Sequence, residues 1–480
     1  VRAMSLRRLA ALGGGVAAAA AALQAERRPC TASAAAAPQR LWCWGRLVPS
    51  AGASAPPPAD DDPAGTASAP RLKERSPVDV SFWSAQGLRV EQMSFGAAHA
   101  AALDDRGNVW AWGANGSAGG ATPTRLAPPP RGKYTSLTST DGSLYAVTSG
   151  GAVLRWANLC DSFAPGPGPG APPPPAVLGG NLAGIAAAGI SAGSSHVLVR
   201  STAGQLYVFG GNERGQLGVG AMPDELEGLL AEQAQQVSGL PPGIKVVQTA
   251  CGRAHSVALL ADGTVYSWGD DRNLQLGVRD DSIKSLKRGA QFLSSPTRLS
   301  GTWIEGKRAL AIAAGGGGIE GGHSVFLLED TNSRAQNSPH QNSRAQGGGS
   351  DEGGRGGGVA GRVEELWACG HGRWGQLGNK AYTHISGPIR VSTLAKLREW
   401  DEGAKQVMPI RITSLSCGDR HTAAVLSSGN IFTWGWNEAG QLGSGNVQGS
   451  HTPGMIKAPA ELRLSRVSRV ACGPNSTCAW

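Results

Sequence analysis

Five histidines recur at one position of a repeated pattern, and their imidazoles could bind a metal ion or act as general bases. They are His99, His196, His255, His323 and His421, and all but His323 lie three residues after a glycine. Equivalent positions of successive repeats belong to different structural units, so these side chains should lie apart around the fold. We therefore predict hydrogen-bonded structural histidines rather than a metal centre or a catalytic ring.

The eight cysteines form no Cys-x-x-Cys pair and no Cys/His cluster at zinc-site spacing. Cys251, Cys417 and Cys472 each directly precede a repeat glycine, where a small apolar side chain suits a packed strand. Cys43 and Cys478 could approach each other, but we do not expect a disulfide there. The sequence also has no nucleophile elbow, phosphate-binding loop or HExxH motif. We predict no catalytic residue, no metal site and no cofactor.

A repeated hairpin positions these residues, and residues 246–277 show it most completely. Two apolar alternating runs, QTACGRAHSVALL and TVYSWG, flank Ala261-Asp262-Gly263. The Asp-Gly pair suits a tight turn that needs a positive φ, so the two runs predict an antiparallel hairpin. A loop follows, from Asp271 to Gly277, whose glycine permits a sharp reversal and whose leucines can point inward.

The same frame recurs along the chain. An aromatic-Gly pair follows the repeat glycine by sixteen residues in Trp112-Gly113, Phe209-Gly210, Trp268-Gly269 and Trp434-Gly435. The trailing loop recurs as NERGQLG at 212–218, HGRWGQLG at 371–378 and NEAGQLG at 437–443. Two copies are degenerate, one around Gly142 and one that an insertion splits between His323 and Trp367. Six copies result, and we interpret Trp112, Trp268, Trp367 and Trp434 as blade packing.

A seventh copy decides the architecture. Residues 467–480 open another repeat, with Ser476 at the histidine position, but the chain stops before its second half. The missing half matches Arg40 to Gly45, RLWCWG, near the start. A ring of sheets hides its edges by closing on itself, so we predict an all-β, seven-bladed β-propeller in which an N-terminal strand completes the C-terminal blade.

These motifs resemble the regulator of chromosome condensation repeat, and the resemblance covers residues 40–480. It implies a seven-bladed propeller that acts without catalysis, and it allows three functional types. The nuclear type is a guanine-nucleotide exchange factor for the Ran GTPase. The ultraviolet-B photoreceptor type carries GWRHT repeats, but this chain has Asp419 where that motif has its tryptophan, so we do not expect a photoreceptor. The third type comprises mitochondrial members.

Residues 1–39 read as a targeting peptide or N-terminal anchor. Of the net charge of +9, a net +5 lies in the first forty residues, which are rich in arginine and alanine. We therefore predict a mitochondrial location, in the matrix or at the inner membrane, with a plastid as the alternative. Leu9 to Leu23 is short and weakly apolar for a membrane span, although charges on both sides leave membrane association open.

Within the propeller at 40–480 we expect a spacer at 46–77, a disordered insertion at 331–362 and a short surface helix at 221–236, where leucines recur at helical spacing. The remaining charge excess is mild, so we do not expect a nucleic-acid surface.

We predict a protein-interaction scaffold, monomeric within a larger complex, that assists assembly or stability of a respiratory or ribosomal complex. Its partner would be a subunit of an organellar complex or a small GTPase. Face loops should hold the partner through Arg253, Asp270, Asp271, Trp374, Asp419, Arg420 and Glu438. Two alternatives stay open: nucleotide exchange on a small GTPase, which calls for an ordered protrusion, and organellar RNA processing, which calls for a positive aromatic face.

Overall fold

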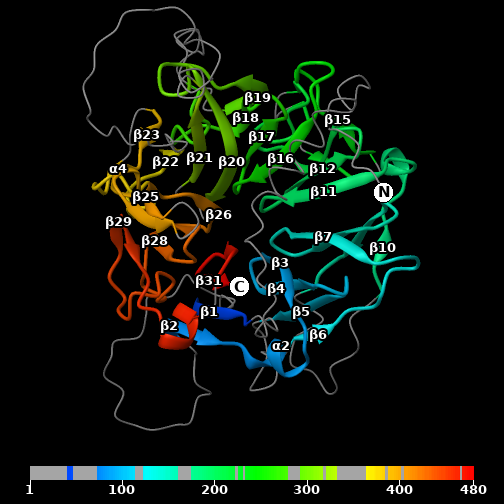
Figure 1. Ribbon diagram of the computed structural model, residues 1–480. Coiled ribbons are helices and arrows are strands. Elements are labelled where there is room, and N and C mark those ends of the chain that lie inside the picture. Colours follow the sequence, from blue (N-terminus) through cyan, green and yellow to red (C-terminus); the bar gives the residue numbers. More distant parts are fainter. Residues whose placement is uncertain are drawn as a thin grey trace, which may run out of the picture.

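The computed structural model shows seven antiparallel sheets arranged as blades around a central axis, so the predicted seven-bladed propeller is confirmed (Figure 1). The structure describes residues 40–46, 73–113, 123–159, 174–221, 225–226, 228–230, 233–278, 292–316, 321–331, 364–383, 387–401, 405–464 and 467–480. The targeting segment 1–39, Leu9 to Leu23 and nearly all of the 331–362 insertion lie outside these ranges. In the described ranges, no helix is long and apolar enough to cross a membrane.

Blades one to three follow one another along the chain, and each runs from the central axis outward. Blade one contains β3 (Val90–Phe95), β4 (His99–Asp104), β5 (Val109–Gly113) and β6 (Thr124–Arg125). Blade two contains β7 (Tyr134–Ser139), β8 (Leu144–Thr148), β9 (Val153–Trp156) and β10 (Ala176–Val177). Blade three contains β11 (Ala187–Ala192), β12 (His196–Ser201), β13 (Leu206–Gly211), β14 (Gly228–Leu229) and β15 (Gln235–Gln236).

Blades four to six repeat this order. Blade four contains β16 (Val246–Cys251), β17 (His255–Leu260), β18 (Val265–Asp270) and β19 (Phe292–Arg298). Blade five contains β20 (Lys307–Gly316), β21 (Gly322–Asp330), β22 (Glu364–Gly370) and β23 (Ile389–Arg390). Blade six contains β26 (Ile412–Cys417), β27 (His421–Leu426), β28 (Ile431–Gly435) and β29 (Ser450–Met455). Short helical turns lie between blades: α2 (Ser81–Ala85), η2 (Gly180–Leu182), α4 (Ser392–Ala395) and α5 (Ala460–Leu464).

The seventh blade joins the two ends of the described chain, as predicted. It consists of β30 (Val470–Cys472), β31 (Ser476–Ala479), β1 (Trp42–Arg46) and β2 (Lys73–Asp79), in the sheet order β2-β1-β31-β30. In the register of β1 against β31, Trp42 lies opposite Ala479 and Gly45 opposite Ser476. Closure therefore comes from a strand that is more than four hundred residues away along the sequence.

Two expectations about this blade need correction. Cys43 and Cys478 lie directly opposite each other in the β1–β31 pair, with Cα atoms 4.2 Å apart, and form a disulfide that we did not expect. The predicted 46–77 spacer also ends earlier than expected, because Lys73–Asp79 is strand β2. It pairs with β1 and supplies the outermost strand of the blade. The neighbouring blades also have a fourth, outer strand, but the short RLWCWG match gave no sign of one here.

The helix expected at 221–236 is absent from the described part of that segment. Its residues instead form β14 and β15, which both pair with β13 on the outer edge of blade three. An unpaired strand edge offers a row of hydrogen-bonding groups, and Gly228 breaks the helical pattern. Edge pairing therefore overrides the leucine spacing.

The core lies between adjacent blades, and this explains why the second strands are continuously apolar. All six residues of β17 are buried. Because side chains alternate along a strand, Ala258 and Leu260 pack with the cluster of blade three, whereas Val257 and Leu259 pack with Ile312 and Phe326 of blade five.

The Asp-Gly turn also forms as predicted. Gly263 has φ = +88° and donates its N–H to the carbonyl of Leu260.

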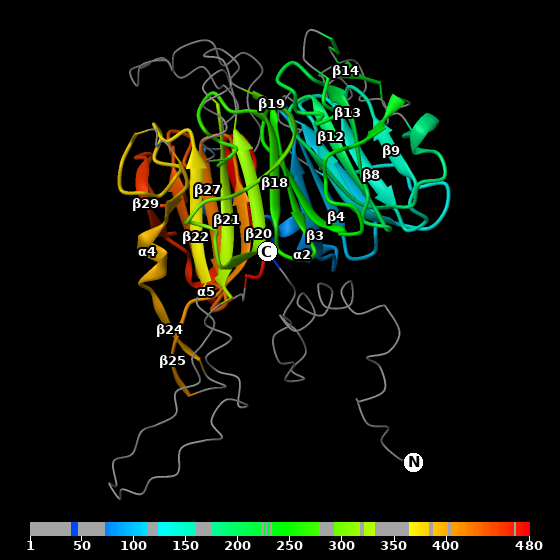
Figure 2. The same ribbon diagram turned by 90° about the horizontal axis from the view of Figure 1, so that it is seen from above.

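A further ordered hairpin leaves the propeller between blades five and six. It consists of β24 (Arg398–Asp401) and β25 (Gln406–Pro409), which pair only with each other among the described strands. Figure 2 shows this hairpin projecting beyond the disc on the side of α5. The side chains of Trp400 and Val407 are opposite each other in the hairpin and are 58% and 61% exposed. This protrusion carries no repeat motif, and we did not predict it.

Candidate functional site

One end of the disc carries both kinds of repeat loop, and we name it the loop face. Each blade is an antiparallel meander, so the loop between its first and second strands lies at the same end as the loop between its third and fourth strands. The first kind contains the residues between the repeat glycine and the histidine, such as 252–254. The second kind contains the GQLG motif. Figure 2 shows the β24–β25 hairpin at the opposite end.

The repeated histidines hold neighbouring blades together, which confirms the structural role that we predicted. The Nε2 atom of His255 lies 2.9 Å from the hydroxyl of Ser324, which in turn donates to the carbonyl of Gln275 at 2.7 Å. The same relay recurs as His196–Ser256–Gln216, His323–Thr422–Gln376 and His421–Thr477–Gln441. Since each hydroxyl donates its proton to the carbonyl, Nε2 must be the donor; the lowered pKa of these rings, about 3 to 4, keeps the imidazoles neutral at pH 7.

Burial lowers the pKa of these imidazoles well below the usual value. The pKa of His255 falls to about 4, and those of His196, His323 and His421 fall to about 3. A base with so low a pKa would be a weak proton acceptor at neutral pH. The rings are also inaccessible, because the repeat glycine packs against them: a Cβ added to Gly252 would lie 2.1 Å from Cε1 of His255. Neither fact suits a catalytic role.

The GQLG motif and the repeated tryptophan complete the same joint. The carbonyl of Gln216 accepts both the Ser256 hydroxyl and the indole N–H of Trp268, each at 2.9 Å. The indole also covers Gly218, where any Cβ would clash with it at 2.5 Å. The buried Leu217 lies between them in the motif. Each GQLG loop therefore binds the tryptophan side chain of the following blade, through its glutamine carbonyl and its last glycine.

Blade five departs from this pattern, because Trp367 packs against the cluster between blades four and five, as predicted, but does not occupy the position of the other repeat tryptophans. The strand register places Cys369, not Trp367, opposite the residue after the histidine. The thiol of Cys369 donates to the carbonyl of Gln275 at 3.3 Å, in place of an indole. Trp367 lies two residues earlier on the same face of β22, beside Trp303 and under the ammonium group of Lys307 at 4.7 Å.

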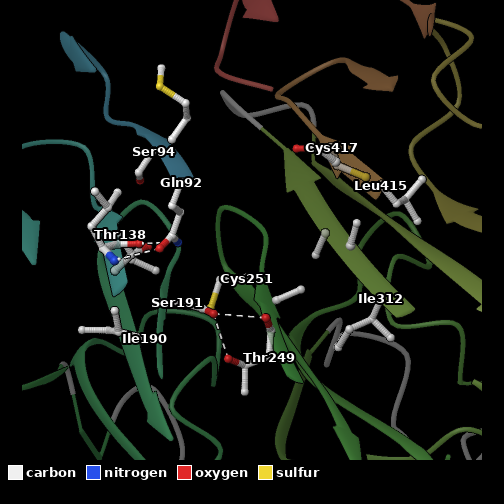
Figure 3. A pocket seen from close by; sticks show the side chains of 17 residues that line it. Gln92, Ser94, Thr138, Ile190, Ser191, Thr249, Cys251, Ile312, Leu415 and Cys417 are labelled. Carbon is white, nitrogen blue, oxygen red and sulfur yellow. Dashed lines mark hydrogen bonds between the residues drawn. The ribbon is translucent and has the colours of Figure 1, made fainter. Parts of the chain in front are cut away.

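A channel runs along the central axis, between the first strands of the blades. Its inner part is a cavity of about 310 Å³, and Figure 3 shows Cys251 and Cys417 among its polar lining. Ser191 bonds the hydroxyl of Thr249 at 2.8 Å across two blades. Burial raises the pKa of the Cys417 thiol well above its ordinary value, so the channel cysteines are protonated and unreactive at neutral pH.

The channel opens on the loop face into a wider mouth of about 590 Å³. Of the predicted site residues, Arg253 and Asp419 line this mouth, and so does Asp141, which the sequence analysis missed. Burial, followed by the charge of Asp141, raises the pKa of Asp419 to about 6, while Arg420 and Arg253 act in the opposite direction. Burial also raises the pKa of Asp141, against the effect of Arg253. Asp141 could have been found from the sequence, because it lies in a degenerate copy of the repeat.

Beside the mouth, two further predicted residues meet. The guanidinium carbon of Arg420 lies 5.1 Å from the ring centroid of Trp374 and 5.2 Å from that of Trp436, and the two indoles are 6.4 Å apart. We name these three residues the Trp–Arg cluster. Cation–π contacts on two rings hold a planar cation in one orientation. Trp436 could have been found from the Trp434-Gly435-Trp436 sequence, which puts a second tryptophan at the start of the loop.

The remaining predicted residues do not join this cluster. Asp270 is buried and bonds the guanidinium of Arg272 at 2.8 Å. Asp271 accepts the N–H of Leu276 at 3.0 Å and so shapes its own loop, and burial raises its pKa to about 7. Asn437 makes the equivalent bond to Leu442 in blade six, which identifies the role of Asp271 as loop closure. Glu438 is exposed on the loop face.

The described residues contain no group of three or more histidine, cysteine, aspartate or glutamate side chains that could hold a metal ion. The loop face offers charged groups, aromatic surface and a polar opening, a combination that suits binding.

Comparison with known proteins agrees with this architecture. Two profiles of the regulator of chromosome condensation (RCC1) repeat match the chain, one at 203–259, 262–319, 364–425 and 428–480, the other at 90–118, 188–216, 246–275 and 412–441. The human RCC1-like G exchanging factor-like protein is 29% identical over 293 residues, which cover 59% of this chain and 59% of that protein. The ultraviolet-B receptor UVR8 of Arabidopsis thaliana is 26% identical over 280 residues, covering 58% and 48% of the two chains.

The chain thus matches about half the length of these curated relatives. Among solved structures, Prp20p from Saccharomyces cerevisiae superimposes with a TM-score of 0.59 at 20% identity, over 92% of this chain and 91% of that one. At this identity the likeness shows the fold alone. The two repeat profiles together cover more than half of the sequence, in register with the blades. The chain belongs to the regulator of chromosome condensation (RCC1) repeat family.

Proposed function

We propose that this propeller is a non-catalytic scaffold that holds a protein partner on its loop face. The observation that carries the proposal is the Trp–Arg cluster at the channel mouth. Tryptophan and arginine are the residues that most often dominate protein interfaces, because each combines a large contact area with specific polar groups. Here both kinds are partly exposed and fixed in place by one another, so little conformational entropy is lost when a partner binds.

The setting that we propose is a mitochondrion, where the scaffold would assist a respiratory or ribosomal complex. The support is the arginine- and alanine-rich composition of residues 1–39. The Cys43–Cys478 disulfide adds a second argument, because disulfides persist in oxidising compartments. Within a mitochondrion it supports the intermembrane side over the matrix, and so favours the respiratory complex over the ribosomal one. Fractionation of organelles with a tagged chain, followed by protease protection, tests this location.

The partner test uses capture from organelles with chemical cross-linking and mass spectrometry. The variant Trp374→Ala/Arg420→Gln removes two members of the Trp–Arg cluster, and Arg106→Gln, at an exposed turn of blade one, serves as the matched control. We expect cross-links to the loop face in the wild type, and at least tenfold less partner with the double variant alone. A partner that is captured equally by all three proteins contradicts the proposal. Nuclease treatment before capture tests the RNA-binding alternative.

Nucleotide exchange on a small GTPase is a second candidate, and the β24–β25 hairpin favours it. The exchange alternative calls for an ordered protrusion, and this hairpin presents Trp400 and Val407 beyond the disc. Glu399 anchors it by accepting hydrogen bonds from Ser427 and Ser428 of blade six. One relative is named as a G exchanging factor-like protein, and the Prp20p structure is titled for binding to Gsp1p and histones.

Release of a fluorescent guanine nucleotide from candidate GTPases distinguishes the two functions. Acceleration by the wild type that Trp400→Ala/Val407→Ser abolishes, and that the exposed control Met455→Ala retains, would replace the scaffold proposal. Unchanged release rates with a GTPase that the capture experiment identifies would leave the scaffold as the function.

A further inference from the structure

Several backbone N–H groups in the wall of the channel mouth already donate hydrogen bonds within the protein. The repeat glycines turn their N–H groups away from the opening, as Gly252 does by donating to the carbonyl of His255 at 3.0 Å. The same bond recurs from Gly96, Gly193, Gly418 and Gly473, to His99, His196, His421 and Ser476. The next N–H groups bond across blades, from Asp141 to the carbonyl of Ser194 and from Ser194 to that of Arg253. Backbone donors for an anion are therefore scarce here.

Acceptors remain in the same wall. The carbonyl oxygens of Gly252, Gly418 and Gly473 lie beside the opening, each 2.2–2.5 Å from where a Cβ would stand on a glycine of the neighbouring blade. The hydroxyl of Ser139 lines the mouth, is only 6% exposed as a residue, and has no hydrogen-bond partner among the described residues. A buried hydroxyl without a partner carries an energetic cost that a ligand can remove.

Two carboxylates stand at the rim above these acceptors. Asp141 and Asp419 come from blades two and six, and after burial the charge of Asp141 is the second cause that raises the pKa of Asp419. The rim is not purely acidic, because Arg253 lowers the pKa of both groups and Arg420 lowers that of Asp419. For Asp419, burial and the charge of Asp141 outweigh the two arginines, and for Asp141 burial outweighs Arg253. An added positive charge would stabilise the carboxylates.

The shape suits a narrow ligand with an apolar stem. The mouth, at about 590 Å³, is lined by Met93, Phe95 and small residues such as Ala192 and Ala314. The methylene groups of a long cationic side chain can pack on apolar walls while the charged end meets acceptors. An ammonium or guanidinium group has three to five donors and no acceptor, which complements a wall rich in acceptors.

We propose that the channel mouth receives a lysine or arginine side chain of the protein partner, bound by Asp141, Asp419 and Ser139. The inference rests on the proposed docking function and names the chemistry of its central contact. The Trp–Arg cluster lies beside the mouth, so one partner can contact both.

The experiment uses small probes in place of the unknown partner. Butylguanidinium and butylammonium carry the ends of arginine and lysine, and butylurea is a neutral match for the first. The chain has five methionines, so methyl-labelled protein gives few NMR signals, and that of Met93 reports on the mouth while Met408 and Met455 lie elsewhere. We expect the cationic probes to shift the Met93 signal with Kd on the order of 1–10 mM, and butylurea to bind at least fivefold more weakly.

Variants then identify the groups. Asp141→Asn and Asp419→Asn should each raise the Kd of the cationic probes about three- to tenfold. Asp262→Asn, at the exposed turn of blade four, should leave that Kd unchanged. Arg253→Gln removes a competing cation and should strengthen binding two- to fivefold. Equal binding of butylurea, no shift of Met93, or weaker cation binding by Arg253→Gln would each overturn the inference.

The capture experiment separates this inference from the docking function. Loss of the partner with the Trp–Arg variant, together with full retention by Asp141→Asn/Asp419→Asn, overturns the cationic contact and keeps the scaffold. Loss with both variants, and a cross-linked partner peptide that contains a protected lysine or arginine, supports both.

Discussion

Reduction of one disulfide should destabilise the whole ring. Cys43 and Cys478 connect the first described strand to the last and are 435 positions apart in the sequence. In the chain-entropy description, a disulfide stabilises a fold by restricting its unfolded chain, and the effect grows slowly with loop length. For a loop of this length the relation gives about 6 kcal/mol, and native disulfides usually contribute about 2–5 kcal/mol. We expect a loss of about 3–5 kcal/mol.

The corresponding shift in melting temperature follows from the size of the protein. An unfolding entropy near 2.1 cal/mol/K for each residue gives roughly 1 kcal/mol/K for a chain of 480 residues. The expected decrease in Tm is then about 3–5 °C. Without the bond, the closing blade is held by the β1–β31 pairing and by the indole of Trp44, which donates to the carbonyl of Gln441 at 2.8 Å. The ring should therefore stay folded at 25 °C.

The assay compares protein refolded with and without reductant, for the wild type and for Cys43→Ala/Cys478→Ala. Calorimetry should show the lower Tm for the reduced wild type, and the double variant should melt at the same temperature in both buffers. Peptide mapping under non-reducing conditions provides the chemical control, since it detects the linked pair directly. Recovery of both cysteines as free thiols from the purified protein, or a Tm that reduction leaves unchanged, would refute the reasoning.

Three further perturbations test the joints between blades. Gly252→Ala should lower the free energy of unfolding in urea by about 2–3 kcal/mol, because the new Cβ would lie 2.1 Å from the His255 ring. Gly142→Ala, where a Cβ would meet nothing within 4 Å, should leave it nearly unchanged. Trp268→Phe should lower the free energy of unfolding by about 2 kcal/mol, since it removes the hydrogen bond from the indole to the Gln216 carbonyl and leaves a cavity. An unchanged urea midpoint would contradict this. Stability should fall as pH drops from 6.5 to 5, because the imidazole pKa is lowered in the folded state and the unfolded chain binds more protons. The raised pKa of Asp271 and that of Asp419 act in the opposite direction, and a Tm that rises on acidification would refute the assignment of neutral histidines.

The sequence was sufficient to predict the ring because its local rules repeat. The spacing from Gly252 to His255 and on to Trp268-Gly269 recurs in register, and each element of it has one physical reason to be there. The glycine makes room for the imidazole, and Gly269, at φ = +100°, takes a conformation that other residues rarely adopt. A repeat that stops halfway then implies a partner strand elsewhere.

The errors arose where contacts between blades, rather than local patterns, decide the outcome. The helical spacing of leucines at 221–236 is a local signal, but the open edge of β13 pairs with that segment instead. Cys369 takes the tryptophan position in the pairing of β21 with β22. The long insertion between these two strands hides that register in the sequence. The β24–β25 hairpin carries no repeat signal at all.

The same contrast explains how the candidate site was only partly found. Loop position alone identified Arg253, Trp374, Asp419 and Arg420, and the structure brings these residues to the mouth and its border. It could not separate them from Asp271, which has the same kind of position but bonds within its own loop. That distinction depends on where the hydrogen-bond donors are directed, which only the folded chain shows.

The joints between blades also explain why the loop face can be specialised. Histidine, serine or threonine, glutamine and tryptophan satisfy one another beneath this face, as the His255–Ser324–Gln275 relay does. The two residues between the glycine and the histidine take no part in that relay through their side chains, so they are free to differ between blades. Blade four has Arg253 and Ala254 there, and blade six has Asp419 and Arg420. Recognition can therefore change at the mouth without cost to the ring, and partner specificity should follow these pairs of residues rather than the histidines.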